Sequence, residues 1–224
     1  MLRNVRLVAA LAGLSCLLAL PAQARNTSRA ATDAAAMVNQ ATETLQKLRT
    51  DSNFDNMLKK AKGVFLVPSL AKGAMVIGGS GGSGVLLVRR NATTWSDPAF
   101  FSVGSISIGA QAGGKVGPVA MFLMTDKAVS SFTQSNNFSL NGDASVTVVK
   151  WSPAVQGSVG KGDVVLWSGE NGLFAGFDLK GSDIVADVRE DKAFYHNSQA
   201  GTKQITSGHI NSAAASKLVA ELPS

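Results

Sequence analysis

A glycine-rich stretch, GGSGGSGVLLVRR at residues 78–90, fits two known patterns of functional loops. The patterns overlap: G-x-G-x-x-G at Gly79, Gly81 and Gly84, and G-x-S-x-G at Gly78, Ser80 and Gly82. The first spacing is that of a loop that binds the pyrophosphate of a dinucleotide. The second is that of a turn that presents a nucleophilic serine. Both require a strand before the glycines and a helix after them.

The residues that follow the glycines favour neither chemistry. VLLVRR has no helical periodicity, so no helix N-terminus is expected to face a phosphate. A serine nucleophile needs a histidine, and both histidines, His196 and His209, fall in the polar C-terminal region, where we expect them at the surface. We interpret the stretch as a structural turn or kink between two apolar strands. Its glycines are Gly78, Gly79, Gly81 and Gly84, and Gly81→Val is expected to lower stability if the φ of Gly81 is positive.

Metal and thiol chemistry lack ligands in this sequence. Two histidines and one cysteine, Cys16, do not supply the ligand spacings of a zinc site. The adjacent carboxylates Glu190 and Asp191 lie in a charged segment and are predicted to be solvated. The sequence therefore predicts no catalytic residue, no metal site and no cofactor.

Residues 1–24 have the pattern of an export signal. Arg3 and Arg6 precede the apolar run of residues 7–20, and an A-x-A cleavage site follows at residues 22–24. The run is shorter than the roughly 20 residues that a membrane helix needs. Cys16 lies inside it, where an ordinary signal residue is favoured over lipoprotein attachment. Without this segment the chain has 19 basic and 15 acidic residues, a net charge of +4. We expect an exported protein of the periplasm or outer envelope, peripherally associated with a membrane.

Residues 25–62 are predicted to form a helical N-terminal arm. Apolar residues recur at steps of three and four: Ala34, Met37, Val38, Ala41, Leu45 and Leu48. Residues 51–53 interrupt this stripe, and Ser52 is expected to cap a second short helix that ends just before Gly63. The stripe fits either the protein core or a membrane surface.

Residues 63–224 are predicted to form a β-rich core that ends in a helix. Short apolar runs bounded by Gly or Pro indicate strands: GVFLVP, GAMVIGG, SGVLLVRR, FFSVGSISIGAQAG and GPVAMFLMT. A short helix is expected over residues 126–132, capped by Thr125 or Asp126, and a hairpin turn at residues 168–172. Residues 188–208 read as irregular, and residues 207–222 as the last helix. The fold class is α+β, with N-terminal helices and a C-terminal helix packed on a Gly-rich, mainly antiparallel sheet or barrel-like core.

Basic residues are concentrated between residues 59 and 90. They are Lys59, Lys60, Lys62, Lys72, Arg89 and Arg90. Lysines at a helix C-terminus stabilise its dipole, so the first three fit an ordinary solvated helix end. They also fit a patch for anionic lipid headgroups, where each Lys or Arg adds about 1 kcal/mol. No nucleic-acid partner is predicted.

An ordered set of motifs resembles the SYLF domain family. The motifs are LKKAKGVFLVP, AKGAMVIGGSGGSGVLLVR, TWSDPAFFSVGSISIGAQAGG, LNGDASV, GLFAGFDLKGSDIV and FYHN, and they span about Asn53 to Ile210. The resemblance implies a non-enzymatic lipid-binding protein whose partner is an anionic phospholipid, a membrane surface or a lipid-like ligand. It also implies that contact runs through an amphipathic N-terminal helix and a nearby basic patch, here the six cations above. The alternative is a structural module of the cell envelope that binds a protein partner without lipid specificity.

Overall fold

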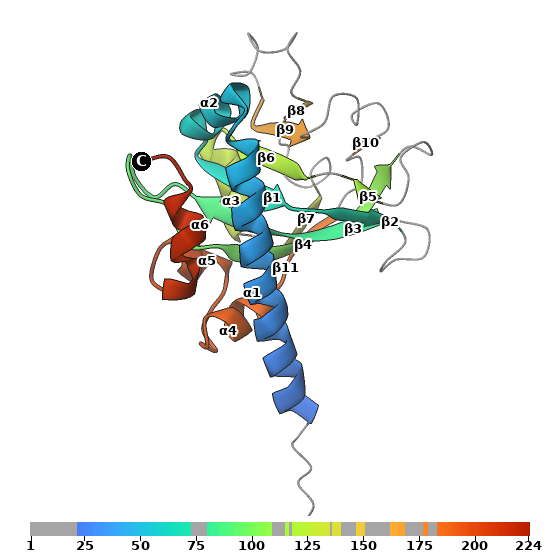
Figure 1. Cartoon of the computed structure of the whole chain (residues 1–224), viewed down its shortest axis with the longest axis vertical. Helices are drawn as coiled ribbons and strands as arrows, with labels where there is room; N and C mark the ends of the chain where they lie inside the picture. The colour runs from blue at the N-terminus through green and yellow to red at the C-terminus, as the bar shows by residue number, and fades with distance from the viewer. Residues whose placement is uncertain are drawn as a thin grey trace, which may run out of the picture.

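The chain has an α+β fold, as the sequence predicts, with an open sheet and with helices at both ends of the chain (Figure 1). The computed structural model describes residues 22–72, 80–108, 115–116, 118–134, 136–139, 147–150, 162–168, 177–178 and 183–224. The described helices are α1 (Ala22–Leu48), α2 (Ser52–Lys60), α3 (Asp126–Gln134), α4 (Val188–Phe194), α5 (Thr202–Thr206) and α6 (Ser216–Ala220), the last preceded by a 3-10 turn at Ala213–Ala215. The export-signal residues 1–21, Gly78, Gly79 and the predicted turn at 168–172 beyond Ser168 lie outside the described residues.

Eleven described strands form one mainly antiparallel sheet. They are β1 (Gly63–Val67), β2 (Leu70–Lys72), β3 (Ser80–Val88), β4 (Ala99–Ile108), β5 (Lys115–Val116), β6 (Val119–Leu123), β7 (Asn137–Ser139), β8 (Val148–Lys150), β9 (Val164–Ser168), β10 (Phe177–Asp178) and β11 (Asp183–Ala186). The main order is β7-β11-β4-β3-β1-β6-β9-β8, and the β8–β9 pair is parallel. Because β7 and β8 do not pair with each other among these strands, the sheet is open, and the barrel-like alternative is wrong.

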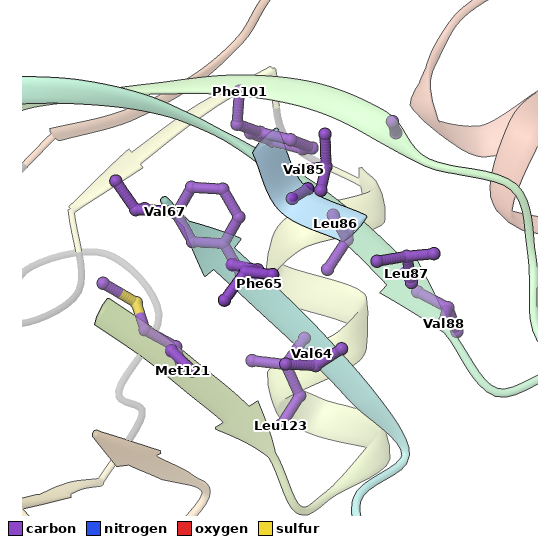
Figure 2. Close-up of a cluster of buried hydrophobic side chains, with 14 of the residues drawn as sticks. Val64, Phe65, Val67, Val85, Leu86, Leu87, Val88, Phe101, Met121 and Leu123 are labelled. Atoms are coloured by element: carbon purple, nitrogen blue, oxygen red, sulfur yellow. The ribbon is translucent and has the colours of Figure 1, made fainter. Parts of the chain in front are cut away.

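The centre of the sheet is covered on both faces. Strands β1 and β6 are buried at every position, which requires a packed layer on each side. On one face, Phe54 of α2 contacts the ring of Phe122, with centroids 5.0 Å apart. On the other, Phe132 of α3 contacts Phe65 at 5.5 Å and Phe101 at 5.7 Å. Figure 2 shows the aliphatic and aromatic side chains of β1, β3 and β6 in this core.

The apolar stripe of α1 faces the protein interior. Ala34, Val38, Ala41 and Leu45 are at most 3% exposed, and α1 packs on β3, α4 and α6. Of the two interpretations left open by the sequence, the core is therefore the correct one for this stripe. The membrane contact through an amphipathic N-terminal helix is wrong for this face, because its apolar surface is already covered.

The cap residues of the short helices follow elementary helix chemistry. Asp51, and not Ser52, caps α2: its carboxylate accepts a hydrogen bond from the Asn53 amide at 2.8 Å. For α3 the Thr125 hydroxyl oxygen accepts from the Ala128 amide at 3.2 Å, which is the first of the two predicted caps. Both caps bind an amide that would otherwise lack a partner.

The C-terminal region differs from the sequence prediction. Residues 188–208 are not irregular, because they contain α4 and α5, which bury Phe194 and Ile205. Of the single helix predicted over residues 207–222, only residues 213–220 are helical, as the 3-10 turn followed by α6. Gly208, which has a φ of +77°, lies just after α5 and ends that helix instead. These helices are one or two turns long, so their apolar periodicity is too short to recognise in sequence. Among the described helices, none is both long and apolar enough to cross a membrane.

Candidate functional site

The glycine-rich stretch is part of a strand. Gly81 and Gly84 lie in β3, so the predicted turn is wrong for them. Between the pairs Ser80–Ile106 and Gly82–Val103, β4 has two residues where β3 has only Gly81, so the bulge lies in β4, opposite Gly81. A Cβ on Gly81 would lie 2.8 Å from the Val103 oxygen, and the φ of Gly81 is not in the positive region. A side chain at Gly81 is therefore excluded by close approach and not by φ.

Gly84 makes room for the aromatic core. A Cβ at this position would lie 2.4 Å from the Leu66 oxygen and 3.0 Å from Cε2 of Phe65. Gly84 pairs with Phe101, so it shares a face with the three rings that meet under α3. These glycines thus serve packing, and the strand that follows them leaves no helix N-terminus for a phosphate.

Five of the six predicted headgroup cations gather at one end of the sheet. Lys59 and Lys60 end α2, Lys62 precedes β1, and the Arg89 amide donates to the Lys62 oxygen at 2.8 Å. Lys72 lies at the opposite end, because it pairs with Ser80 at the start of β3. The length of β3 separates it from the others by roughly 25 Å at ~3.3 Å per residue. The structure therefore does not bring the six cations into one patch.

Two of the lysines are in ion pairs. Lys59 Nζ lies 2.7 Å from Asp55 Oδ2, and Arg49 Nε donates to Asp55 Oδ1 at 2.9 Å. Lys59, opposed by burial and assisted by Arg49, holds the pKa of Asp55 below its usual range. Lys62 Nζ lies 2.6 Å from Asp126 Oδ2 on α3. Lys60 is exposed at the end of α2.

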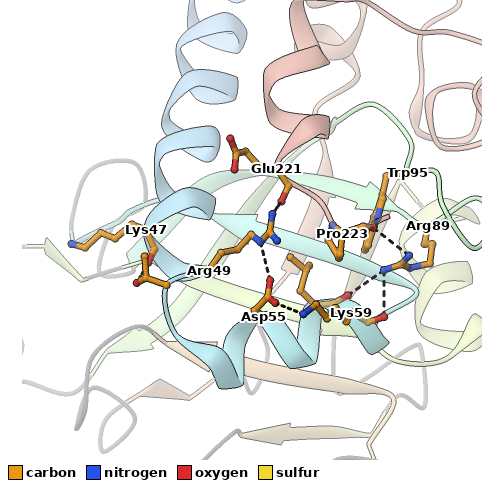
Figure 3. Close-up of polar contacts among 10 residues, drawn as sticks. Lys47, Arg49, Asp55, Lys59, Arg89, Trp95, Glu221 and Pro223 are labelled. Atoms are coloured by element: carbon orange, nitrogen blue, oxygen red, sulfur yellow. Dashed lines mark hydrogen bonds and ion pairs between the residues drawn. The ribbon is translucent and has the colours of Figure 1, made fainter.

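Arg89 is turned inward and holds the end of α2 (Figure 3). Its guanidinium donates to the Ala61 oxygen at 3.2 Å and the Lys59 oxygen at 3.4 Å, which are among the last carbonyls of the helix. It lies 4.4 Å from the centre of the Trp95 ring, and Trp95 Nε1 donates to the Pro223 oxygen at 2.8 Å. Burial lowers the pKa of Arg89. Arg89 therefore joins α2, the loop after β3 and the C-terminal tail, and Trp95 is buried as part of the same contact.

Arg90 has a different environment from its neighbour. It is exposed, and its guanidinium lies so close to Gly208 that a Cβ there would be 2.2 Å from Cζ. Nearby Asp97 accepts a hydrogen bond from the Ser212 amide at 2.6 Å. Burial raises the pKa of Asp97, while the Ser212 amide and the charge of Arg90 oppose that rise. Of the predicted cations, Lys60 and Arg90 are thus the exposed ones outside an ion pair among the described residues.

The acidic residues of α4 are the feature that the sequence reasoning missed. Asp191 is fully buried, and its Oδ1 accepts from the Phe100 amide at 2.9 Å. Strand β11 ends at Ala186, which pairs with Phe101, so β11 supplies no further strand carbonyl for the Phe100 amide. The Asp191 carboxylate accepts that hydrogen bond instead. Burial raises the pKa of Asp191 to about 7, and burial together with Asp187 raises that of Glu190 to about 7. The prediction of solvated carboxylates is wrong for Asp191, which is fully buried against β4, whereas Glu190 is half-buried.

The comparisons with known proteins agree on one family. A family model described as "Las17-binding protein actin regulator" and called Ysc84 matches residues 104–224, more than half of the chain. The chain is 29% identical over 160 residues to LAS seventeen-binding protein 3 of Saccharomyces cerevisiae, covering 69% of this chain and 34% of that protein. It is 29% identical over 143 residues to SH3 domain-containing YSC84-like protein 1 of Bos taurus, covering 62% of this chain and 42% of that protein. The chain thus spans between a third and a half of these relatives. No solved structure matches it.

Proposed function

Because the chain belongs to the Ysc84 family, the family of the SYLF domain, we propose that it is a non-enzymatic binding protein that docks on anionic phospholipid surfaces. The contact surface is the basic end of α2, which we define as Lys59, Lys60 and Lys62, with Arg90 beside it. Gly81 and Gly84 lie in a strand, which fits neither a dinucleotide-binding loop nor a turn that presents a nucleophilic serine. No group of three or more metal-ligating side chains occurs among the described residues. The binding role is supported by the family description and by the names of the relatives, which are those of binding proteins.

The observation that carries the proposal is the exposure of three lysines at one helix end. Exposed ion pairs contribute at most about 1 kcal/mol, so Lys62 can exchange Asp126 for a lipid phosphate at small cost. The Lys59 side chain is also exposed, while its partner Asp55 remains paired with Arg49 if Lys59 leaves. Since the apolar stripe of α1 is buried, this helix offers no apolar stripe for insertion into a membrane. The contact is therefore electrostatic and should weaken as salt shortens the Debye length from about 10 Å at 0.1 M to about 3 Å at 1 M.

The test is co-sedimentation of the purified protein with vesicles at low and high salt. Vesicles of phosphatidylcholine are compared with vesicles that also contain phosphatidylglycerol. The test variant carries K59E, K60E and K62E, and the control variant carries K47E, K203E and K217E, which invert three other exposed lysines. We expect salt-sensitive binding to the anionic vesicles, lost in the test variant and retained in the control. Equal loss in both variants would show a response to net charge alone and would remove the basic end of α2 as a site.

The second candidate is a protein partner. It is favoured by the family description and by the name of the yeast relative, both of which describe Las17-binding proteins. Those relatives are longer, so the partner named there belongs to proteins of which this chain spans a part. Failure to bind any vesicle, with a fully folded protein, would favour this second candidate.

Export is the remaining part of the proposal. Cleavage after Ala24 would leave most of α1 and all of its buried stripe in the mature chain, since the first buried position is Ala30. Expression with the full signal and sequencing of the mature N-terminus should give Arg25 as the first residue. An intact N-terminus in the cytosolic fraction would contradict export.

A further inference from the structure

A groove lies between the N-terminal end of α1 and α4. It has a volume of about 660 Å³, within the range of roughly 300–1,000 Å³ typical of small-molecule sites. Its lining residues are Thr27, Val188, Arg189, Lys192, Ala193, His196, Asn197 and Ser198. Thr27 is the described lining residue from α1, whose N-terminal end projects past α4 in Figure 1.

The lining combines apolar surface with positive charge. Val188 and Ala193 supply apolar groups, while Arg189 and Lys192 supply two cations and His196 a ring that can hydrogen-bond. Among the described residues that line the groove, none is Asp or Glu. Arg189, Lys192 and His196 are three and four residues apart, so they follow one face of α4 and the turn after it. The groove is therefore complementary to a molecule with one anionic end.

The two cations are available for a ligand. Within the described part of the chain, neither Arg189 nor Lys192 is ion-paired or hydrogen-bonded through its side chain. Both side chains belong to exposed residues. Three acids lie nearby, Glu190 and Asp187 beside Arg189 and Asp33 on α1. Burial, together with Asp187 and Asp33, raises the pKa of Glu190 to about 7 against the opposing charge of Arg189, so part of its charge is absent at neutral pH. An anion would thus meet two cations that form no ion pair among the described residues, although the charge of Arg189 also acts on Glu190.

The backbone at His196 is held in an unusual conformation. His196 has a φ of +48°, the described non-glycine residue with a positive φ, in the position after the helix C-cap where glycine is preferred. The Asn197 amide donates to the Lys192 oxygen at 3.2 Å and closes this turn. A side chain kept at such a position costs about 1 kcal/mol, and here it places an imidazole at the groove.

We infer that this groove binds a single-chain anionic amphiphile, a carboxylate or phosphate on one alkyl chain. The anion is held by Arg189 and Lys192 with a hydrogen bond from His196, and the alkyl chain lies against Val188 and Ala193. An arginine fork suits both oxyanions. The site lies on α4 and shares no residue with the basic end of α2, so it stands or falls independently of vesicle docking.

Equilibrium dialysis of the full chain tests charge and chain separately. Four probes are used below their micellar concentrations: laurate, dodecyl phosphate, dodecyl maltoside and inorganic phosphate. The first two carry both the anion and the chain, the third only the chain, and the fourth only the anion. The test variant is R189Q/K192Q, and the matched control K203Q/K217Q removes two exposed cations from α5 and α6. Circular dichroism and melting curves verify that both variants fold.

We expect laurate and dodecyl phosphate to bind the native chain and the control, and to bind R189Q/K192Q at least roughly tenfold more weakly, because two charge-assisted hydrogen bonds are lost. Dodecyl maltoside and inorganic phosphate should not bind measurably. Equal affinity in the test variant and the native chain would overturn the site. Binding of inorganic phosphate as tight as that of dodecyl phosphate would overturn the alkyl part of the inference. A variant with Thr27→Trp, which narrows the groove from the α1 wall, should also lose both amphiphiles.

Discussion

The basic end of α2 and the groove on α4 both carry clustered cations, yet the fold uses these cations in opposite ways. At the end of α2, the Arg89 guanidinium donates its hydrogen bonds to backbone carbonyls, and Lys59 and Lys62 are in ion pairs. At the groove, Arg189 and Lys192 have no such partners among the described residues. The density of basic residues in a sequence therefore does not measure the charge that remains for a ligand.

The same two regions differ in what their carboxylates do. Asp55 lies between Arg49 and Lys59, which favour its ionised form. Asp191 is buried beside the edge of β4 and meets no cation in an ion pair among the described residues, so burial favours its neutral form. The end of α2 is thus held by paired charge, whereas α4 is held by a buried carboxyl group.

The largest expected effect is the difference in free energy of unfolding between a variant of Arg89 and a variant of Arg189. Arg89→Ala removes the hydrogen bonds that hold the last carbonyls of α2 and the packing on Trp95, and should lower the free energy of unfolding by about 3 kcal/mol. Arg189→Ala, the matched exposed arginine, should change it by less than about 0.5 kcal/mol. Urea unfolding of the two variants measures the difference. Similar losses in both would end the distinction between a structural and an available arginine.

The roles of α1, Gly84 and Arg89 depend on tertiary contacts that the sequence indicates only in part. The stripe of α1 predicted a helix correctly, but whether it faces core or membrane depended on α4 and α6, which are too short for their periodicity to be recognised. The role of Gly84 depends on Phe65 and Phe101, which reach it from two neighbouring strands. Arg89 belongs to VLLVRR, and nothing in that run distinguishes it from Arg90. Their difference arises because one side chain reaches α2 and the other reaches Gly208.

The second prediction concerns pH. The pKa of Asp191 is about 7 in the folded chain and 3.8 without the fold, so its contribution to stability is full below about pH 4 and decreases as the pH rises to about 7. One such proton changes the stability by up to about 1.4 kcal/mol per pH unit. Asp191→Asn should remove this share of the pH dependence, measured by urea unfolding between pH 4 and 8.

A matched variant on α2 gives the opposite sign. The pKa of Asp55 is lowered, so its contribution is present above about pH 4 and is lost as the pH falls. Asp55→Asn should therefore reduce stability at pH 7 and have less effect below about pH 4, in unfolding curves extended to about pH 2. An unchanged pH profile in Asp191→Asn, or the same sign of change in both variants, would contradict the assignment of a buried neutral carboxyl group to α4.

The third prediction is smaller and links stability to the groove. His196→Gly replaces a strained residue by the one preferred at a φ of +48°, and should raise the free energy of unfolding by about 1 kcal/mol. The same change removes the imidazole from the groove and should weaken laurate binding. A gain in melting temperature together with a loss of affinity would show that the conformation is kept for the ligand. A gain in melting temperature with unchanged affinity would leave His196 outside the site.

The smallest expected effect lies at the exposed pair of Lys62 and Asp126. The Asp126 side chain is 85% exposed and that of Lys62 47%, so water screens their attraction although the charged atoms are 2.6 Å apart. Lys62→Ala should lower the free energy of unfolding by less than about 0.5 kcal/mol, and the loss should shrink further in 1 M salt.

The more informative measurement on this ion pair is vesicle binding. If Lys62 exchanges Asp126 for a lipid phosphate, Asp126→Ala should strengthen binding to phosphatidylglycerol vesicles, because the lysine loses its competitor. Weaker vesicle binding in Asp126→Ala would mean that the pair positions Lys62 rather than competing for it, and the contrast with the unpaired cations of α4 would then concern geometry and not available charge.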